Sequence, residues 1–275
     1  MLLLLAALLA GCGGAKLVYQ QLDVLLPWYF RDYVDLDTGQ RQQLRRSVDT
    51  LLAWHRETEV MRYAAFFRDL ERDAGRPLGR ERLHAARMEL EDFWDDIARR
   101  ITPDAAALLS TLSDSQVEEL FAGIAEGDRK VEKELRGRTE QERSERREKA
   151  LRSQLERWVG PLDPRQRVMV QACVRDMRAD TAGWLESRRR WQAAFRESLA
   201  LRGDPVRFQP ALERLLVDGE SLWPAEYRRQ FDADRARVLQ LIVDVDASLS
   251  AGQRDRLRRH LERWALDFES IAGGA

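Results

Sequence analysis

The sequence has few residues that could crosslink a fold through disulfides or metal ions: its 275 residues include two cysteines and three histidines. Two cysteines exclude a disulfide framework, and no zinc-binding spacing is present. Glycine and proline are also sparse, at 16 and 8 residues, so long helices would be interrupted at few points. No apolar run reaches the roughly 20 residues that a membrane-spanning helix needs. Stability must therefore come from the packing of regular elements in a core.

Charged residues are abundant but balanced. They make up 34% of the chain, with 46 Lys and Arg against 47 Asp and Glu, while 44% of the residues are hydrophobic. This balance excludes an overall positive field that would attract nucleic acid. Such a composition is typical of long amphipathic helices. Apolar residues recur at helical spacing without a convincing strand, so we predict an all-α fold, a bundle of long amphipathic helices.

The first residues are similar to a bacterial lipoprotein signal. Leu2 to Leu9 form an apolar run typical of a signal peptide, and Leu9-Ala10-Gly11-Cys12 follows. This ending resembles a lipobox, and the resemblance implies that residues 1–11 are removed and that Cys12 carries the lipid. By the same resemblance, Gly13 favours the outer membrane. The alternative is an ordinary signal peptide or a short helix that contains a buried cysteine.

Behind Cys12 we expect a lipidated, aromatic-rich segment (residues 12–35) and then a helical domain (residues 36–272), in which an internal boundary would fall near 137–162. The segment contains Tyr19, Trp28, Tyr29, Phe30 and Tyr33. These rings either close one end of the helical core, which we favour, or lie at the membrane interface. Within the domain, an apolar stripe predicts one continuous helix from residue 163 to a break at residues 203–205.

Four phrases of nine residues are similar to one another: LDTGQRQQL from 36, LSDSQVEEL from 112, LDPRQRVMV from 162 and LSAGQRDRL from 249. Each has Leu, then Asp or Ser, then Gln after two variable residues: Leu36, Asp37 and Gln40; Leu112, Ser113 and Gln116; Leu162, Asp163 and Gln166; and Leu249, Ser250 and Gln253. We interpret the phrase as a helix start. The Asp or Ser oxygen accepts from the Gln amide N–H, the Gln side chain accepts from the cap residue's N–H, and the Leu packs on the first turns.

The phrase can be explained in two ways. Four helices simply need good starts, or the phrase is a signature of the fold. The constant Leu, and the use of Gln in a chain rich in Glu, favour a signature. The intervals between phrases, 76, 50 and 87 residues, are too uneven for a solenoid. A further capping box, Thr139 with Glu142, is expected at the start of a charged helix.

The phrase resembles the Leu-Thr-x-x-Gln motif of the Spy and CpxP group, all-helical periplasmic chaperones and stress regulators that carry two copies. The match differs in having four copies, with Asp or Ser in place of Thr. A second resemblance rests on Leu17–Asp23, Leu26–Tyr29, Tyr33–Leu36 and Leu52–Arg56 together with the lipobox. These stretches look like a proteobacterial lipoprotein family known only as a domain of unknown function, and that likeness implies no activity.

Candidate catalytic and metal-binding groups are few. Of the histidines, His55 and His260 lie on apolar stripes, where a buried structural role is favoured over a ligand role, and His84 completes the set. Glu89, Asp92 and Asp96 could share a helix face and attract a cation, but a solvated face is favoured. Cys173 has no disulfide partner if Cys12 is lipidated, and its apolar neighbours indicate a buried thiol. We predict no enzyme activity, no cofactor and no metal.

The sequence therefore predicts a non-catalytic, lipid-anchored periplasmic protein that binds other proteins, with a chaperone or envelope-stress role as one form of that function. The alternative is a structural or assembly accessory of the outer membrane that acts through one dedicated partner. Its expected partners are the membrane, through the lipid on Cys12, and envelope proteins; nucleic acid is not expected.

Overall fold

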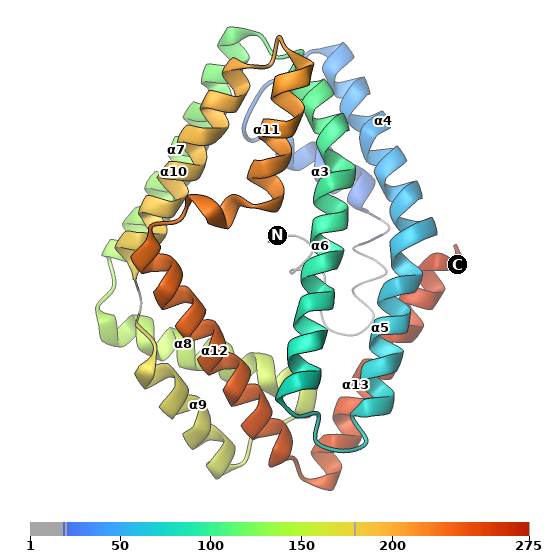
Figure 1. Ribbon diagram of the computed structural model, residues 1–275, viewed down its shortest axis with the longest axis vertical. Helices are drawn as coiled ribbons and strands as arrows, with labels where there is room; N and C mark the ends of the chain where they lie inside the picture. Colours follow the sequence, from blue (N-terminus) through green and yellow to red (C-terminus); the bar gives the residue numbers. More distant parts are fainter. Residues whose placement is uncertain (1–18, 20, 179, 275) are drawn as a thin grey trace.

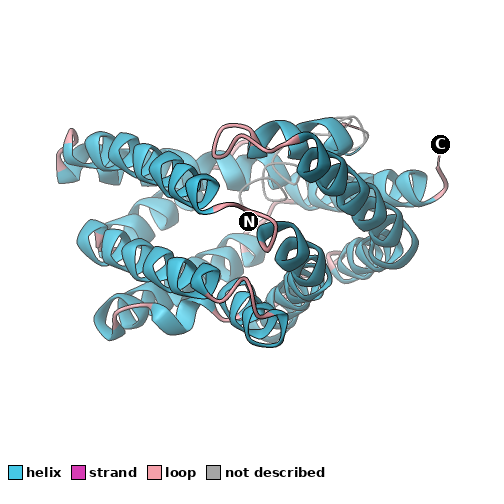
Figure 2. Cartoon of the chain, turned by 90° about the horizontal axis from the view of Figure 1, so that it is seen from above, coloured by secondary structure: helices cyan, strands magenta, loops and turns pink. Residues whose placement is uncertain are grey.

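The protein is all-α, as the sequence predicts. The computed structural model describes residue 19, residues 21–178 and residues 180–274, and this part of the chain contains helices and loops but no strand (Figures 1 and 2). Cys12 and the predicted signal peptide lie outside the described residues. No helix in the described part is both long and apolar enough to cross a membrane.

The helices follow one another through short connections (Figure 1). In chain order they are α3 (Leu22–Phe30), α4 (Thr38–Trp54), a π-helical turn (His55–Glu59), α5 (Val60–Asp73), α6 (Arg80–Leu109), α7 (Asp114–Arg136), α8 (Glu140–Val159), α9 (Pro164–Asp176), α10 (Thr181–Ala200), α11 (Pro205–Val217), a short 3-10 helix (Gly219–Leu222), α12 (Ala225–Ala247) and α13 (Ala251–Ala272). The π-helical turn joins α4 and α5 into one long, irregular helix.

The prediction of one continuous helix from residue 163 was wrong. The chain leaves the helical conformation at Met177, whose ψ is 140°, and α10 begins after Asp180. The Asp180 carboxylate accepts a hydrogen bond of 2.7 Å from the Gly183 amide, so a new N-cap forms inside the apolar stripe. Because the stripe continues on both sides of this cap, its periodicity gives no sign of the break.

The two halves of the chain repeat one order of elements. In the first half, α4 and α5 form a long interrupted helix that begins at one phrase, α6 runs back in the opposite direction, and α7 begins at the next phrase. In the second half, α9 and α10 form the interrupted helix, α11 and α12 run back in the opposite direction, and α13 begins at the last phrase. Helix α8, at residues 140–159, connects the halves. This repeated order accounts for the uneven intervals between the phrases. The two phrases of each half are 76 and 87 residues apart, and the last phrase of the first half and the first phrase of the second are 50 residues apart.

The halves interlock through their last helices. Helix α13 packs along α5, where Phe67 stacks on Trp264 with ring centroids 5.7 Å apart. Helix α7 lies beside α10, where Phe121 contacts Phe195 at 5.7 Å and Arg196 pairs with Glu118 at 2.6 Å (Figure 1). Each half therefore contributes its last helix to the core of the other half.

Candidate functional site

The four phrases form the same helix start. At α4, α7, α9 and α13, the Asp or Ser side chain accepts from the amide of the Gln three residues later. The Gln side chain accepts in turn from the backbone N–H of the cap residue. Three of the leading leucines, Leu36, Leu112 and Leu162, are buried. This arrangement satisfies N–H groups that the first turn of a helix leaves without partners.

The structure also brings the phrases together in pairs, which the sequence did not predict. Gln40 and Gln116 exchange two side-chain hydrogen bonds, with Nε2 to Oε1 distances of 3.0 and 2.7 Å. Gln166 and Gln253 do the same at 3.0 and 2.9 Å. We call these the first and second glutamine pairs. They lie at opposite ends of the long axis, where α4 meets α7 and α9 meets α13 (Figure 1).

Each amide in these pairs also holds the loop that precedes the partner helix. Gln40 Nε2 donates to the Thr111 carbonyl at 2.9 Å, and Gln116 Nε2 donates to the Asp35 carbonyl at 2.8 Å. In the second pair, Gln253 Nε2 donates to the Pro161 carbonyl at 2.9 Å, and Gln166 Nε2 approaches the Ser248 carbonyl at 3.4 Å and its Oγ at 3.2 Å.

This network explains why the phrase uses Gln rather than Glu. A glutamine amide has two N–H donors and an oxygen that accepts two bonds, and the pairs engage all of them. A carboxylate could complete the capping box but could not donate to the partner or to its loop. The exposed capping box of α8, at Thr139, uses Glu142, and the hydrogen bonds of Glu142 within the described part of the chain are to Thr139.

One glutamine of each pair is buried and the other is half-buried, so the pairs are packed junctions between helix starts rather than open ligand sites. Gln166 is 0% exposed and Gln40 is 4% exposed. A ligand could bind these amides only by breaking the contacts between two helix starts. Each glutamine thus does more than cap its own helix, because it also holds the start of the partner helix in place.

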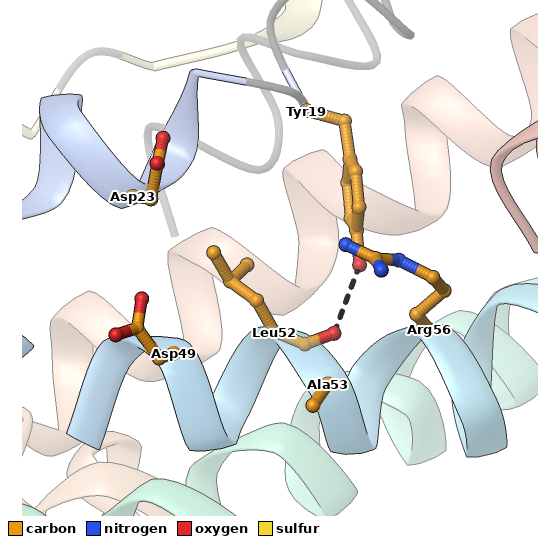
Figure 3. Close-up of a pocket in the computed structure, with 6 residues that line it drawn as sticks. All are labelled: Tyr19, Asp23, Asp49, Leu52, Ala53 and Arg56. Carbon is orange, nitrogen blue, oxygen red and sulfur yellow. Dashed lines mark hydrogen bonds between the residues drawn. The ribbon is translucent and has the colours of Figure 1, made fainter. Parts of the chain in front are cut away.

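A second cluster, which the sequence did not predict, lies at the π-helical turn between α4 and α5. The buried His55 ring lies between two phenols: its Nδ1 is 3.1 Å from the Tyr19 hydroxyl and its Nε2 is 3.1 Å from the Tyr63 hydroxyl. The Tyr19 hydroxyl also lies 3.3 Å from the Leu52 carbonyl, as Figure 3 shows. These contacts fix the Tyr19 side chain against the end of α4 and the π-helical turn.

The surroundings of His55 keep its ring neutral. Burial lowers the His55 pKa to about 4. Burial also raises the pKa of the Tyr63 phenol. The Glu59 carboxylate of the same turn is 1% exposed and accepts from Arg62 at 2.7 Å, and Arg62 also bonds to Asp96 at 2.7 Å. The buried carboxylate is thus neutralised by a guanidinium, while His55 is held by neutral phenols.

Beside this cluster is a small pocket between α3 and α4. It encloses about 250 Å³ and is lined by Tyr19, Asp23, Asp49, Leu52, Ala53 and Arg56 (Figure 3). Pockets for small molecules usually enclose about 300–1,000 Å³ and bury most of the ligand. The lining has two carboxylates and one guanidinium, and Figure 3 shows Arg56 lying against the Tyr19 ring. This pocket is better suited to a few ordered waters than to a substrate.

The remaining sequence candidates are dispersed. Glu89 and Asp92 are exposed, Asp96 is held by Arg62, and the described residues contain no group of three or more His, Cys, Asp or Glu side chains that could hold a metal ion. His84 is exposed, and Cys173 is a half-buried thiol whose pKa is raised by burial. His260 accepts a hydrogen bond of 3.1 Å from the Trp264 indole.

The described rings of the aromatic segment differ in burial. Tyr33 and Leu26 pack against the core that contains the first glutamine pair's leucines. Trp28, Tyr29 and Phe30 are exposed, with exposed fractions of 55%, 44% and 39%. Most of the segment's rings therefore do not close the core.

Comparison with known protein families identifies the family of the chain. A model of a family of unknown function (DUF6279) matches residues 32–228. The chain belongs to this family. The match covers the first glutamine pair and Gln166 and ends before Gln253. Comparisons with curated proteins and with solved structures give no match.

Proposed function

We propose that this member of the family is a non-catalytic, lipid-anchored helical protein of the cell envelope that binds other proteins. The lipid on Cys12 would hold it at a membrane, by preference the outer membrane, with the helical domain in the periplasm. The observation that carries the proposal is the lipobox-like Leu9-Ala10-Gly11-Cys12, placed ten residues before an all-helical frame. Resemblance of the phrases to Spy and CpxP motifs supports the same location.

The surface favours a folded partner over unfolded clients. A chaperone that captures unfolded chains needs a contiguous exposed apolar patch. Here the Trp and Phe rings of α5, α6 and α13 pack on one another in the core. The described aromatic residues that remain exposed belong to α3, which follows the proposed anchor in the sequence. This arrangement supports the second candidate function, an assembly accessory that acts through one dedicated partner.

The exposed helix faces away from α3 are rich in charge of both signs. On α7, Lys130 and Glu126 form an exposed pair, and on α12, Arg229 pairs with Glu226, with side chains 69% and 76% exposed. Exposed ion pairs contribute little to stability, so such residues are free to be complemented by another protein. We therefore place the partner surface on charged helix faces rather than in an apolar groove.

In-cell photo-crosslinking tests this proposal. A photoreactive amino acid is placed at Lys130 and, separately, at Arg229 in the full chain, and the captured proteins are identified. One stoichiometric envelope protein supports the dedicated-partner function, whereas a spread of unfolded clients supports the chaperone function. If neither position captures a protein, the protein-binding proposal is wrong for both faces and loses its basis.

A Cys12→Ser variant separates the anchor from protein binding. We expect this variant to leave the membrane fraction, because its attachment through acyl chains is lost. A variant that still fractionates with the outer membrane would refute lipidation at Cys12. Crosslinks at Lys130 or Arg229 that persist in the released variant would show that the partner recognises the helical domain itself.

A further inference from the structure

We infer that one face of α3 lies in the lipid interface of the membrane that holds Cys12. This face comprises Val24, Leu25, Trp28 and Tyr29, with exposed fractions of 66%, 36%, 55% and 44%. No residue of α3 is fully buried, although the helix is more apolar than the others. The inference deepens the proposed function and rests on its lipid anchor.

The four side chains share one side of the helix. Residues four apart lie nearly above one another in an α-helix, so Val24 lies beside Trp28 and Leu25 beside Tyr29. Successive residues turn by about 100°, which puts Asp23 on the opposite side, where it lines the small pocket. Within α3 this face contains no charged residue, and the exposed Arg31 and Asp32 follow directly after the helix.

The chemistry of this face fits a lipid interface better than a polar partner. Trp and Tyr concentrate at the level of lipid headgroups, because their rings are apolar and their N–H and O–H groups can still reach water. The Tyr29 hydroxyl bonds to the Tyr33 hydroxyl at 2.9 Å, which orients its polar end along the helix surface. Without a basic residue in the face, attraction should come from apolar and aromatic contact and not from anionic lipid.

The distance to the anchor supports the same occupant. Leu22 follows Cys12 by ten positions, and a fully extended chain spans at most about 36 Å over that distance in sequence. A lipid on Cys12 thus keeps α3 within reach of the bilayer at all times. Because the tether holds the α3 face close to the bilayer, even weak binding of this face to lipid is sufficient to keep it there.

Spin labelling of the lipidated full chain tests this inference. A nitroxide is attached at Val24→Cys or at Val168→Cys in a Cys173→Ala background, and the protein is reconstituted in vesicles of phosphatidylethanolamine and phosphatidylglycerol. Val168 is the matched control, since it is a valine 62% exposed on α9, at the far end of the molecule in Figure 1. We expect the label at position 24 to collide with oxygen and to lose most collisions with a water-soluble nickel complex. The label at position 168 should show the reverse.

A label at position 24 that meets the nickel complex as often as the control would overturn the inference. A crosslinker at Trp28 that captures a protein in cells would then identify the true occupant. Added salt should not change the result, because no charge attracts the face to lipid; strong salt dependence would contradict the apolar mechanism.

A second arm separates this inference from the failure of natural lipidation. The Cys173→Ala chain, expressed without its first 11 residues, is coupled through Cys12 to a maleimide lipid in the same vesicles. Brominated lipids should then quench the fluorescence of this chain more than that of its Trp28→Phe variant. Equal quenching of the chain and its Trp28→Phe variant would refute membrane contact by α3. If the chain is quenched more than the variant but the protein is not lipidated in cells, only the natural anchor is refuted.

Discussion

Replacing Gln166 by Glu would show whether the glutamine pairs stabilise the fold beyond helix capping. Glutamate at this position still accepts from the Asp163 amide, which now donates to the Gln166 side chain at 3.0 Å. It loses both donors, to Gln253 Oε1 at 3.0 Å and to the Ser248 oxygens at 3.2 and 3.4 Å. The substitution therefore keeps the capping box and the bond accepted from Gln253 Nε2, and it removes only the bonds that Gln166 Nε2 donates to the second helix start.

The cost follows from burial. Two buried hydrogen bonds contribute about 1 kcal/mol each, and their unpaired partners add a desolvation penalty of about 1–3 kcal/mol. An ionised carboxylate at a site that is 0% exposed would also face oxygen atoms instead of donors. We expect Gln166→Glu to lower the free energy of unfolding by about 3–5 kcal/mol at pH 7, measured by urea denaturation.

The loss should be smaller at low pH. Burial and neighbouring oxygens raise the pKa of the introduced carboxyl in the folded state above its unfolded value, so the folded state binds more protons and gains stability as the pH falls. A protonated carboxyl also regains one donor. Relative to the unmodified protein, the variant should therefore recover part of its stability between pH 7 and pH 5.

Two controls isolate the pair. Glu142→Gln changes the same position of the exposed capping box at Thr139 and should alter stability by less than about 0.5 kcal/mol. Gln166→Ala and Gln253→Ala should be coupled by about 1–2 kcal/mol, while Gln40→Ala and Gln253→Ala, from different pairs, should be additive within about 0.5 kcal/mol. If Gln166→Glu costs no more than the roughly 1 kcal/mol of a lost cap, the glutamines only cap helices and our reasoning is wrong.

Further predictions concern the π-helical turn, the end of α8 and the middle of α7. Because the His55 pKa is lowered to about 4, the unfolded chain binds a proton as the pH falls below 6.5 and the folded chain does not, so stability is lost between those values. This contribution approaches about 3 kcal/mol at pH 4, and the loss in His55→Gln should be smaller by about that amount, as measured by urea denaturation across this pH range; an equal loss in that variant would exclude His55 as its cause. Gly160 has φ 81° and a Cβ there would overlap the Arg256 side chain, so Gly160→Ala should cost about 1–3 kcal/mol in thermal unfolding. Gly127→Ala, at an open position inside α7, should instead stabilise by about 0.4–1 kcal/mol, and matching effects at the two glycines would contradict this explanation.

Sequence reasoning succeeded where the determinants are local. The capping boxes require only residues three apart, so Asp37 with Gln40 or Ser250 with Gln253 can be read directly from the chain. The all-α fold follows from apolar spacing that repeats over most of the chain.

It failed where the determinants are distant or compete. Gln40 and Gln116 are 76 residues apart, and no local pattern states which phrase meets which. The break near Met177 is caused by a single cap, Asp180, within an apolar stripe that continues on both sides. The π-helical turn rotates the residues after it relative to a regular α-helix, and the spacing of apolar residues is too loose to reveal that rotation. The contacts of His55 with Tyr19 and Tyr63 could therefore not be predicted from the sequence. The preference for Gln over Glu was the one signal that pointed to the pairs.

The repeat of elements gives a reason for keeping both pairs. Each half places its last helix on the interrupted helix of the other half, and Trp264 of α13 is only 3% exposed there. A half without its counterpart would leave this surface in water, so residues 137–162 separate two repeats rather than two independent packing units. The glutamine pairs act within each half, where they fix the start of the last helix against the start of the first. The junctions therefore fix the N-terminal ends of α7 and α13, and from these ends the two helices extend to pack on the other half.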